Sequence, residues 1–292
     1  MMSGGLPGNL ANDVIPLLRQ FCIGGYGIAI GGSYAKGISD EQSDVDVYVF
    51  AKQILPCGQR SALIEQGIGT LAQVISWGND AEFVEGGTDF WYVGRKVECW
   101  FRNAQRIEKT LQMCEEGRIE RACVVWTVMG FYNYVALSDI HVMQIVEDPY
   151  GILGRWKARI AEYPQALRKA IMGRYLAEAQ FWPENFHYRS AVERGDILYT
   201  SGIVQQVVYA LIQVVFALNR VYFPGEKKVG VVLEKLALQP QEFNQRIREL
   251  VYPGNAGSIA HLRAQREALV GLVHDVKKLV EDGDNMQESG KQ

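Results

Sequence analysis

Apolar positions in about the first hundred residues alternate between helical spacing and short continuous runs. Val14, Leu17 and Phe21 recur three or four positions apart, which is typical of one helix face, and Asn12 is suited to capping that helix. Short apolar runs next to glycines, such as residues 26–30, are typical of buried strands. The expected elements are a helix over 12–22 ended by Gly24 and Gly25, strands over 26–30 and 44–50, a helical turn from Ser33, a helix over 59–74, and a hairpin with arms 89–93 and 97–101.

The pattern changes after about residue 103, where strand signals fade and helical periodicity continues almost to the end of the chain. The sequence therefore predicts an α+β protein, with a mixed sheet and helices over residues 1–103 and a helical bundle over residues 104–281. Residues 282–292 are polar and are expected to form a disordered tail.

The segment 197–219 contains no charged residue and is long enough to cross a bilayer. It carries several polar residues, Gln205, Gln206 and Gln213 among them, and charged amphipathic segments flank it. A buried helix within a bundle explains this pattern better than a membrane span, so no membrane association is expected.

Composition and charge narrow the function classes. The 292 residues carry a formal net charge of −3, whereas dedicated nucleic-acid binders have a strongly basic face, so no nucleic-acid partner is expected. The five cysteines are scattered without a Cys-x-x-Cys pair, which is typical of reduced thiols. The first residues lack a basic stretch followed by an apolar one, so a cytoplasmic location is expected.

The candidate chemistry starts at Gly31-Gly32-Ser33, which Asp44-Val45-Asp46 follows eleven residues later. Gly32 allows the backbone to approach a triphosphate, and the Ser33 hydroxyl and N–H can donate to phosphate oxygens. Asp44 and Asp46 would lie on one face of a strand, because side chains there repeat every two residues. Two such carboxylates suit Mg²⁺, which binds through carboxylates and substrate phosphates.

A further carboxylate, Glu98, lies in the apolar and aromatic second arm of the hairpin, where it has no obvious structural purpose. Asp89 is the second choice, because it opens the first arm and is expected at the edge of the sheet. The structural alternative for Glu98 is a salt bridge to Arg95 or Arg102.

The run from Gly31 to Gly37, followed by Ser43-Asp44-Val45-Asp46, resembles the signature of the polymerase-beta-like nucleotidyltransferase superfamily. Within it, the match is to the version found in antibiotic nucleotidyltransferases and minimal nucleotidyltransferases. Lys36 stands where arginine is commoner, which keeps the charge but loses the bidentate fork.

This resemblance implies that Asp44 and Asp46 hold two Mg²⁺ ions around a nucleoside triphosphate. It also implies a third carboxylate on a neighbouring strand, for which Glu98 is the candidate, either as a metal ligand or as the general base. Nucleotide contacts are then expected at Gly32, Ser33, Lys36 and Ser43.

In the expected helical bundle, an apolar helix ends at Asn219-Arg220. The chain then continues through Pro224-Gly225 to Lys227-Lys228. This layout is similar to the helical C-terminal domain of lincosamide- and aminoglycoside-type nucleotidyltransferases, which closes the cleft and lends basic residues to the triphosphate. By that resemblance Lys227 or Lys228 reaches the phosphates. The alternative is a solvated turn.

The expected reaction is transfer of a nucleoside monophosphate, AMP from ATP, to a hydroxyl of a small molecule such as an antibiotic, with release of pyrophosphate. One alternative is nucleotidyl transfer onto a protein or an RNA, as in toxin–antitoxin pairs built from similar domains. The other is a non-catalytic nucleotide-binding regulatory module, which loss of a carboxylate would favour; all three candidate carboxylates are present.

Overall fold

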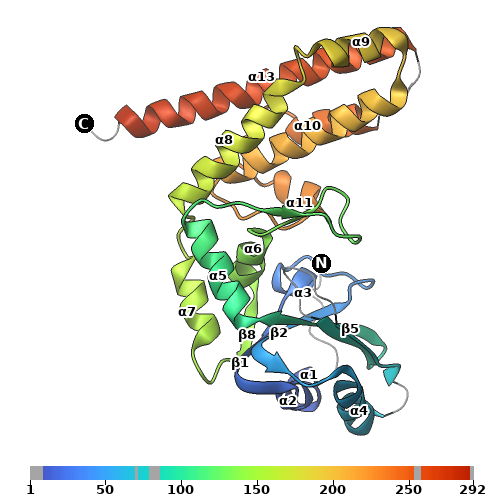
Figure 1. Cartoon of the computed structure of the whole chain (residues 1–292), viewed down its shortest axis with the longest axis vertical. Coiled ribbons are helices and arrows are strands. Elements are labelled where there is room, and N and C mark those ends of the chain that lie inside the picture. Colours follow the sequence, from blue (N-terminus) through green and yellow to red (C-terminus); the bar gives the residue numbers. More distant parts are fainter. Residues whose placement is uncertain (1–8, 70–71, 79–85, 253–257, 290–292) are drawn as a thin grey trace. The chain divides into compact units, whose positions relative to one another are not determined.

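The structure, a computed structural model, describes residues 9–69, 72–78, 86–252 and 258–289. The chain divides into two units (Figure 1). Unit 1 comprises residues 1–113 and 133–162, and unit 2 comprises residues 114–132 and 163–292. These ranges differ from the expected 1–103 and 104–281, because the chain leaves unit 1, forms a short excursion in unit 2 and then returns.

Unit 1 is built on a six-stranded mixed sheet in the order β3-β4-β5-β2-β1-β8. Only the β2–β5 pair is parallel among the described pairings of this sheet. The strands are β1 (Cys22–Ile30), β2 (Val45–Ile54), β3 (Ile75–Gly78), β4 (Gly86–Tyr92), β5 (Arg95–Asn103) and β8 (Gln144–Glu147). The helices are α1 (Leu10–Asp13), α2 (Ile15–Gln20), α3 (Gly32–Ala35), α4 (Cys57–Ile68), α5 (Ala104–Glu115), α6 (Val135–Val142) and α7 (Ile152–Arg159).

One face of the sheet is the core of unit 1. Val45, Val47 and Val49 of β2 are fully buried there, together with Val97 and Cys99 of β5, against apolar residues of α1, α2 and α4. Because side chains alternate along a strand, the even-numbered residues of β2 and β5 lie on the opposite face. Asp46, Tyr48 and Phe50 therefore share a face with Glu98, Trp100 and Arg102, and this face carries the candidate site.

Unit 2 is mostly helical and contains the small β6–β7 pair (Arg121–Ala122 and Phe131–Tyr132). Its helices are α8 (Gln165–Phe181), α9 (Phe186–Arg194), α10 (Ile197–Leu218), α11 (Val229–Leu233), α12 (Phe243–Val251) and α13 (Ile259–Ser289). α10 is long and apolar enough to cross a membrane by length and composition, but most of it is buried among α8, α9, α12 and α13. The expected buried bundle helix is thus present.

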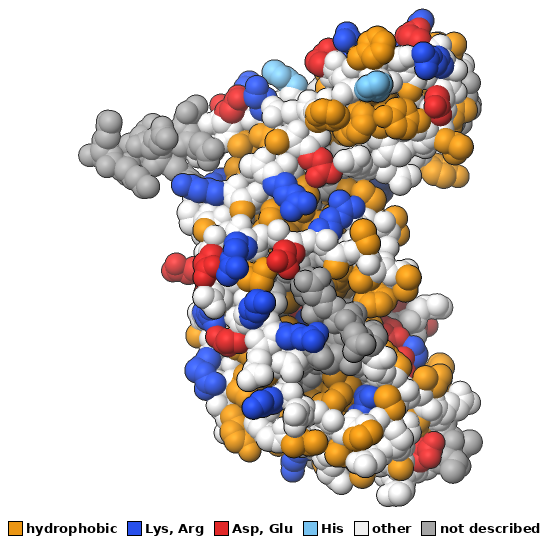
Figure 2. Space-filling view, in the orientation of Figure 1, with side chains coloured by type: hydrophobic (Ala, Val, Ile, Leu, Met, Phe, Trp, Pro, Cys, Tyr) orange, Lys and Arg blue, Asp and Glu red, His pale blue; other side chains and the backbone are white. Residues whose placement is uncertain are grey.

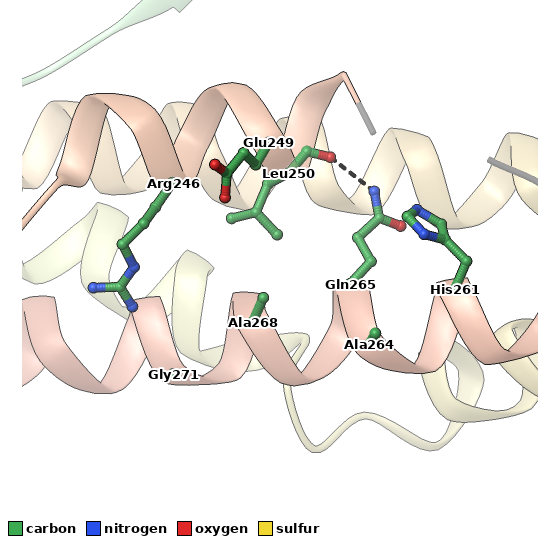
Figure 3. Close-up of a pocket in the computed structure, with 8 residues that line it drawn as sticks. All are labelled: Arg246, Glu249, Leu250, His261, Ala264, Gln265, Ala268 and Gly271. Carbon is green, nitrogen blue, oxygen red and sulfur yellow. Dashed lines mark hydrogen bonds between the residues drawn. The ribbon is translucent and has the colours of Figure 1, made fainter. Parts of the chain in front are cut away.

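Two surface features of unit 2 are visible in the figures. Apolar side chains gather over the region of α9 and the start of α10, where Phe186 and Leu198 are exposed (Figure 2). Between α12 and α13 there is a cavity of about 320 Å³, bordered by Ala264 and Ala268 and bounded by a hydrogen bond from Gln265 to the Leu250 carbonyl (Figure 3). None of the expected site residues lines this cavity.

The α+β class with a mixed sheet and a helical C-terminal region is confirmed. The hairpin is confirmed too, as β4 and β5 joined by Val93 and Gly94. The expected helix over 12–22 is wrong, since α1 and α2 are separate and Asn12 lies inside α1. Pro16, near the start of α2, has no N–H to continue the helical ladder across this junction.

Other boundaries also differ from expectation. Gly24 and Gly25 lie inside β1 at a register shift, where a bulge lets the strand continue. α4 ends at Ile68 instead of residue 74, because Gly69 adopts a positive φ of 101° there. Helix α13 continues to Ser289 through most of the expected tail, and residues 290–292 lie outside the described part.

Four short strands, β3, β6, β7 and β8, were not expected from the sequence. Each has four residues or fewer, which is too short for a clear alternation of apolar and polar residues.

The β4–β5 turn gives a stability prediction. Val93 and Gly94 have φ values of 49° and 72°, as in the two-residue turns that favour Asn-Gly. A β-branched side chain is unfavourable in this left-handed region, and Val93 is exposed, so little packing opposes its replacement. We expect Val93→Asn to raise the free energy of unfolding by about 1 kcal/mol. Chemical denaturation measures this, with Val93→Ala as the control; an unchanged or lower midpoint for Val93→Asn would contradict the explanation.

Candidate active site

The site begins where β1 ends and the chain turns back at Gly31 and Gly32. The Gly31 N–H donates to the Asp46 carbonyl at 2.9 Å, and Gly32 has a φ of 56°. A Cβ on Gly31 would overlap the Tyr48 ring, and one on Gly32 would overlap the Asp46 carboxylate. The two glycines are therefore required for this turn to lie directly against β2.

The carboxylates come together through strand register. Asp46 of β2 is the Cα partner of Glu98 on the parallel strand β5. Asp44 lies just before β2 begins, not inside the strand as expected. Asp44 and Asp46 are half-buried while Val45 and Val47 are fully buried, so both aspartates nevertheless lie on the face away from the core.

Asp46 is half-buried and lies close to several other carboxylates, and the pKa of its carboxyl is shifted as a result. Burial is the largest cause that raises the pKa of the Asp46 carboxyl, followed by the negative charges of Asp44, Glu98 and Asp139. Lys36 opposes these effects in part, and the resulting pKa is about 7 instead of the ordinary 3.8. A carboxylate with such a perturbed pKa, surrounded by others, is typical of a functional site.

Asp139 of α6 is a fourth carboxylate that the sequence analysis missed. It is buried, and its side chain accepts a hydrogen bond from Arg102 Nη2 at 2.8 Å. The Tyr48 hydroxyl lies 3.5 Å from the other Asp139 oxygen and accepts the Gly32 N–H at 3.3 Å. This network, composed of Arg102, Asp139 and Tyr48, connects the glycine turn to β5 and α6. The only sequence signal for it was an aspartate within an apolar helical segment.

Ser33, Lys36 and Ser43, which are expected to contact the nucleotide, differ from one another in their hydrogen bonds and neighbours. The Ser33 hydroxyl is buried and has no hydrogen-bond partner within the described part of the chain. Lys36 follows α3, and its charge acts on Asp46. The Ser43 hydroxyl instead closes a local turn, since it donates to the Asp40 carboxylate and accepts the Asp40 N–H, each at 2.9 Å. A phosphate contact by any of the three stays a prediction.

Glu98 forms an ion pair, but not with the partners considered from the sequence. Lys96 Nζ lies 2.5 Å from Glu98 Oε1 and 3.4 Å from Asp89 Oδ2. Arg95 instead donates to the Glu41 carbonyl, and Arg102 pairs with Asp139. The strand period explains the choice of Lys96 over Arg95, since residues 96 and 98 share a face whereas residue 95 lies on the other. Arg102 shares the face of Glu98 but lies four residues further along β5 and is paired with Asp139.

Asp44, Asp46 and Glu98 are the side chains expected to bind Mg²⁺. Among residues whose placement is described, no group of three or more Asp, Glu, His or Cys side chains is arranged to hold a metal ion. Asp44 and Asp46 have the hard oxygen ligands that Mg²⁺ prefers, and their shared face fits such an ion. Glu98, however, is bonded to Lys96. The binding of two Mg²⁺ ions therefore stays a prediction.

Lys227 and Lys228 belong to unit 2, in the segment between α10 and α11. Lys228 has a φ of 57° and precedes α11. The neighbouring Glu226 accepts the backbone N–H groups of Val128 and Met129, at 2.8 and 2.6 Å, so this segment anchors the β6–β7 loop. A phosphate contact by either lysine stays a prediction.

Comparisons with known proteins give a limited result. Residues 133–228 match a family model described as a domain of unknown function, DUF4037. No curated protein matches the chain. A nucleotidyltransferase-like protein from Exiguobacterium sibiricum is similar at 14% identity and a TM-score of 0.45, covering 89% of this chain and 71% of that one. A STING-associated c-di-GMP synthase from Capnocytophaga granulosa is similar at 11% identity and a TM-score of 0.23, covering 94% and 80% respectively. Similarities at these levels add no weight to the site described above.

The raised pKa of Asp46 predicts how stability depends on pH. Between about pH 4 and pH 7 the folded protein retains a proton that the unfolded chain loses, so this contribution to stability disappears as the pH rises through about 7. We expect the uncharged isostere Asp46→Asn to be more stable than wild type at pH 8 by at least about 1 kcal/mol, with a smaller gain at pH 5. Thermal unfolding at both pH values measures this, with the exposed Glu65→Gln as control. A pH-independent difference would contradict the crowding of charges.

The Arg102–Asp139 pair predicts a second effect on stability. Arg102→Met leaves the buried Asp139 carboxylate uncompensated near Asp46, and loss of one partner of a buried pair costs about 3–5 kcal/mol. Replacing both partners with apolar residues removes the unpaired charge, so Arg102→Met with Asp139→Leu should recover most of this loss. Urea denaturation measures both variants. A double variant no more stable than Arg102→Met would show that the pair is not the source of the loss.

Proposed function

We propose that this protein is a metal-dependent nucleotidyltransferase that moves AMP from ATP onto a hydroxyl of a small molecule and releases pyrophosphate. The observation that supports this most strongly is the glycine turn lying against Asp46 of β2, with Glu98 beside it on β5 and Asp44 just before β2 begins. The sequence resemblance to the polymerase-beta-like superfamily rests on the glycine turn and the two aspartates, and it implies a third carboxylate, for which Glu98 is the candidate.

In this proposal the turn holds the triphosphate. Gly31 and Gly32 bring the backbone close, and the Ser33 hydroxyl, which is buried without a partner among the described residues, donates to a phosphate oxygen. Lys36 contributes positive charge beside the phosphates, since it already acts on Asp46. Positioning and electrostatic stabilisation of this kind account for most of the catalysis of phosphoryl-type transfer.

Asp44 and Asp46 would hold Mg²⁺, which when bound neutralises phosphate charge and eases deprotonation of the acceptor hydroxyl. Glu98 would take the proton of that hydroxyl or complete the ligand set. The acceptor oxygen forms a bond to the α-phosphorus of ATP, and the bond from that phosphorus to the bridging oxygen breaks. Pyrophosphate leaves with those electrons, and AMP remains on the acceptor.

A small-molecule acceptor is proposed because the resemblance is to the antibiotic branch and because the chain carries a net charge of −3. A charge of this sign offers no general attraction for a polyanion such as RNA. Aminoglycosides and lincosamides are therefore the first acceptors to examine.

The test combines binding with turnover. Purified protein is incubated with Mg²⁺, radiolabelled ATP and a panel of aminoglycosides and lincosamides, and calorimetry measures ATP binding with and without Mg²⁺. We expect Mg²⁺-dependent ATP binding and pyrophosphate release with at least one acceptor, and a loss of at least about 100-fold in activity for Asp44→Asn with Asp46→Asn.

The matched control is Glu267→Gln, which removes an exposed carboxylate from α13 in unit 2. This variant should bind ATP and react as wild type does. Failure of the wild-type protein to bind ATP in the presence of Mg²⁺, together with no pyrophosphate release for any acceptor, would reject the proposal.

A further inference from the structure

We propose that Lys96 is a positioning residue, an internal counterion that occupies Glu98 until a divalent cation replaces it, and that Asp89 is the partner that then receives Lys96. This inference rests on the proposed function, since it concerns how Glu98 becomes available to the metal. It also explains why the described carboxylates do not already form a metal-binding group.

Glu98 lies within a row of three acidic residues that crosses the sheet. Asp46 is its Cα partner on β2, and Asp89 is its Cα partner on β4. Directly paired residues on neighbouring strands lie on the same face, about 5 Å apart. Glu98 therefore lies between Asp46 on one side and Asp89 on the other.

Lys96 lies next to this row, on the same strand as Glu98. It precedes Glu98 by two residues on β5, so both side chains lie on the same face. Its Nζ lies 2.5 Å from Glu98 Oε1 and 3.4 Å from Asp89 Oδ2. The shorter contact is a charge-assisted hydrogen bond, while the longer one is an ion pair that a small side-chain movement could tighten.

Lys96 and a bound cation would compete for the same oxygen atoms of Glu98. A carboxylate oxygen that accepts a short hydrogen bond from an ammonium group has less electron density to offer a cation, and the ammonium charge repels that cation. A cation on the Asp46 side would therefore draw Glu98 away from Lys96. Asp89 would keep Lys96 neutralised on the far side, so the exchange leaves no charge uncompensated.

The side chain at position 96 suits such an exchange. An ammonium group on a flexible four-carbon stem can turn from one carboxylate to the other, whereas the rigid guanidinium fork of arginine favours a fixed bidentate pair. The Lys96 side chain is 40% exposed, compared with 20% for Glu98 and 23% for Asp89, so it has room to move.

The chain supplies a matched control in Arg95. It is the neighbour of Lys96 on β5, lies on the other face and donates to the Glu41 carbonyl instead of a carboxylate of the row. Arg95→Met removes a charge of the same sign from the adjacent position of β5, on the other face, without removing a contact to Glu98. It therefore separates the general electrostatic field from the specific Lys96–Glu98 bond.

Titration calorimetry with Mn²⁺ and with Mg²⁺, on the nucleotide-free protein at fixed ionic strength, measures the dissociation constants. We expect Lys96→Met and the more polar Lys96→Gln to bind the cation about 10-fold more tightly than wild type, and Arg95→Met to bind within about 2-fold of wild type. In the Lys96→Met background, adding Glu98→Gln should abolish the gain. Asp89→Asn should weaken binding several-fold, because Lys96 then has only Glu98 as a partner.

The outcomes separate this inference from the proposed function. If wild type binds the cation, and Lys96→Met and Lys96→Gln bind it no more tightly than Arg95→Met does, the counterion role is rejected while the proposed function stands. If neither wild type nor these variants bind the cation, with or without ATP, both are rejected. An equal gain in the Glu98→Gln background would also reject the role, since the effect would not pass through Glu98.

Discussion

The parallel pairing of β2 with β5 is the constraint on which the candidate site depends. Its register sets Asp46 beside Glu98, and the alternation of side chains sends these two away from a core made by Val45, Val47 and Val97. A shift of one residue in either strand would exchange the two faces, burying the carboxylates and exposing the valines. The burial of the valines therefore fixes the position of the acidic side chains, and the stability of the core maintains an arrangement of like charges that repel one another.

That repulsion is balanced locally by groups around the cluster. Arg102 pairs with Asp139, Lys96 pairs with Glu98, and Lys36, which follows α3, acts on Asp46. For Asp46, the charge of Lys36 offsets burial and the neighbouring carboxylates only in part, so the pKa of this carboxyl stays raised. The negative charge of the site is thus least neutralised at Asp46. A cation bound at Asp46 would therefore contribute most to stability.

The sequence predicted the features that depend on local pattern. The glycines, the two aspartates and the hairpin arm carrying Glu98 could all be identified because each departs from what its strand or turn context would otherwise favour. The Lys96–Glu98 pair was missed because the expected hairpin arm began at residue 97, whereas β5 begins at Arg95 and includes Lys96. Asp139 could not be identified because its place beside the cluster depends on tertiary packing of a helix, α6, that follows the excursion into unit 2. The short strand β8 was missed for the same reason, since its pairing with β1 is a tertiary contact.

The most direct test of the account is a crystal structure with Mn²⁺ and a non-hydrolysable ATP analogue, using the anomalous signal of the metal. The account predicts a peak within ligand distance, about 2.2 Å, of carboxylate oxygens of both Asp44 and Asp46, with a triphosphate against Gly32 and Ser33. A well-ordered analogue bound elsewhere, or a metal peak that contacts neither aspartate, would contradict it.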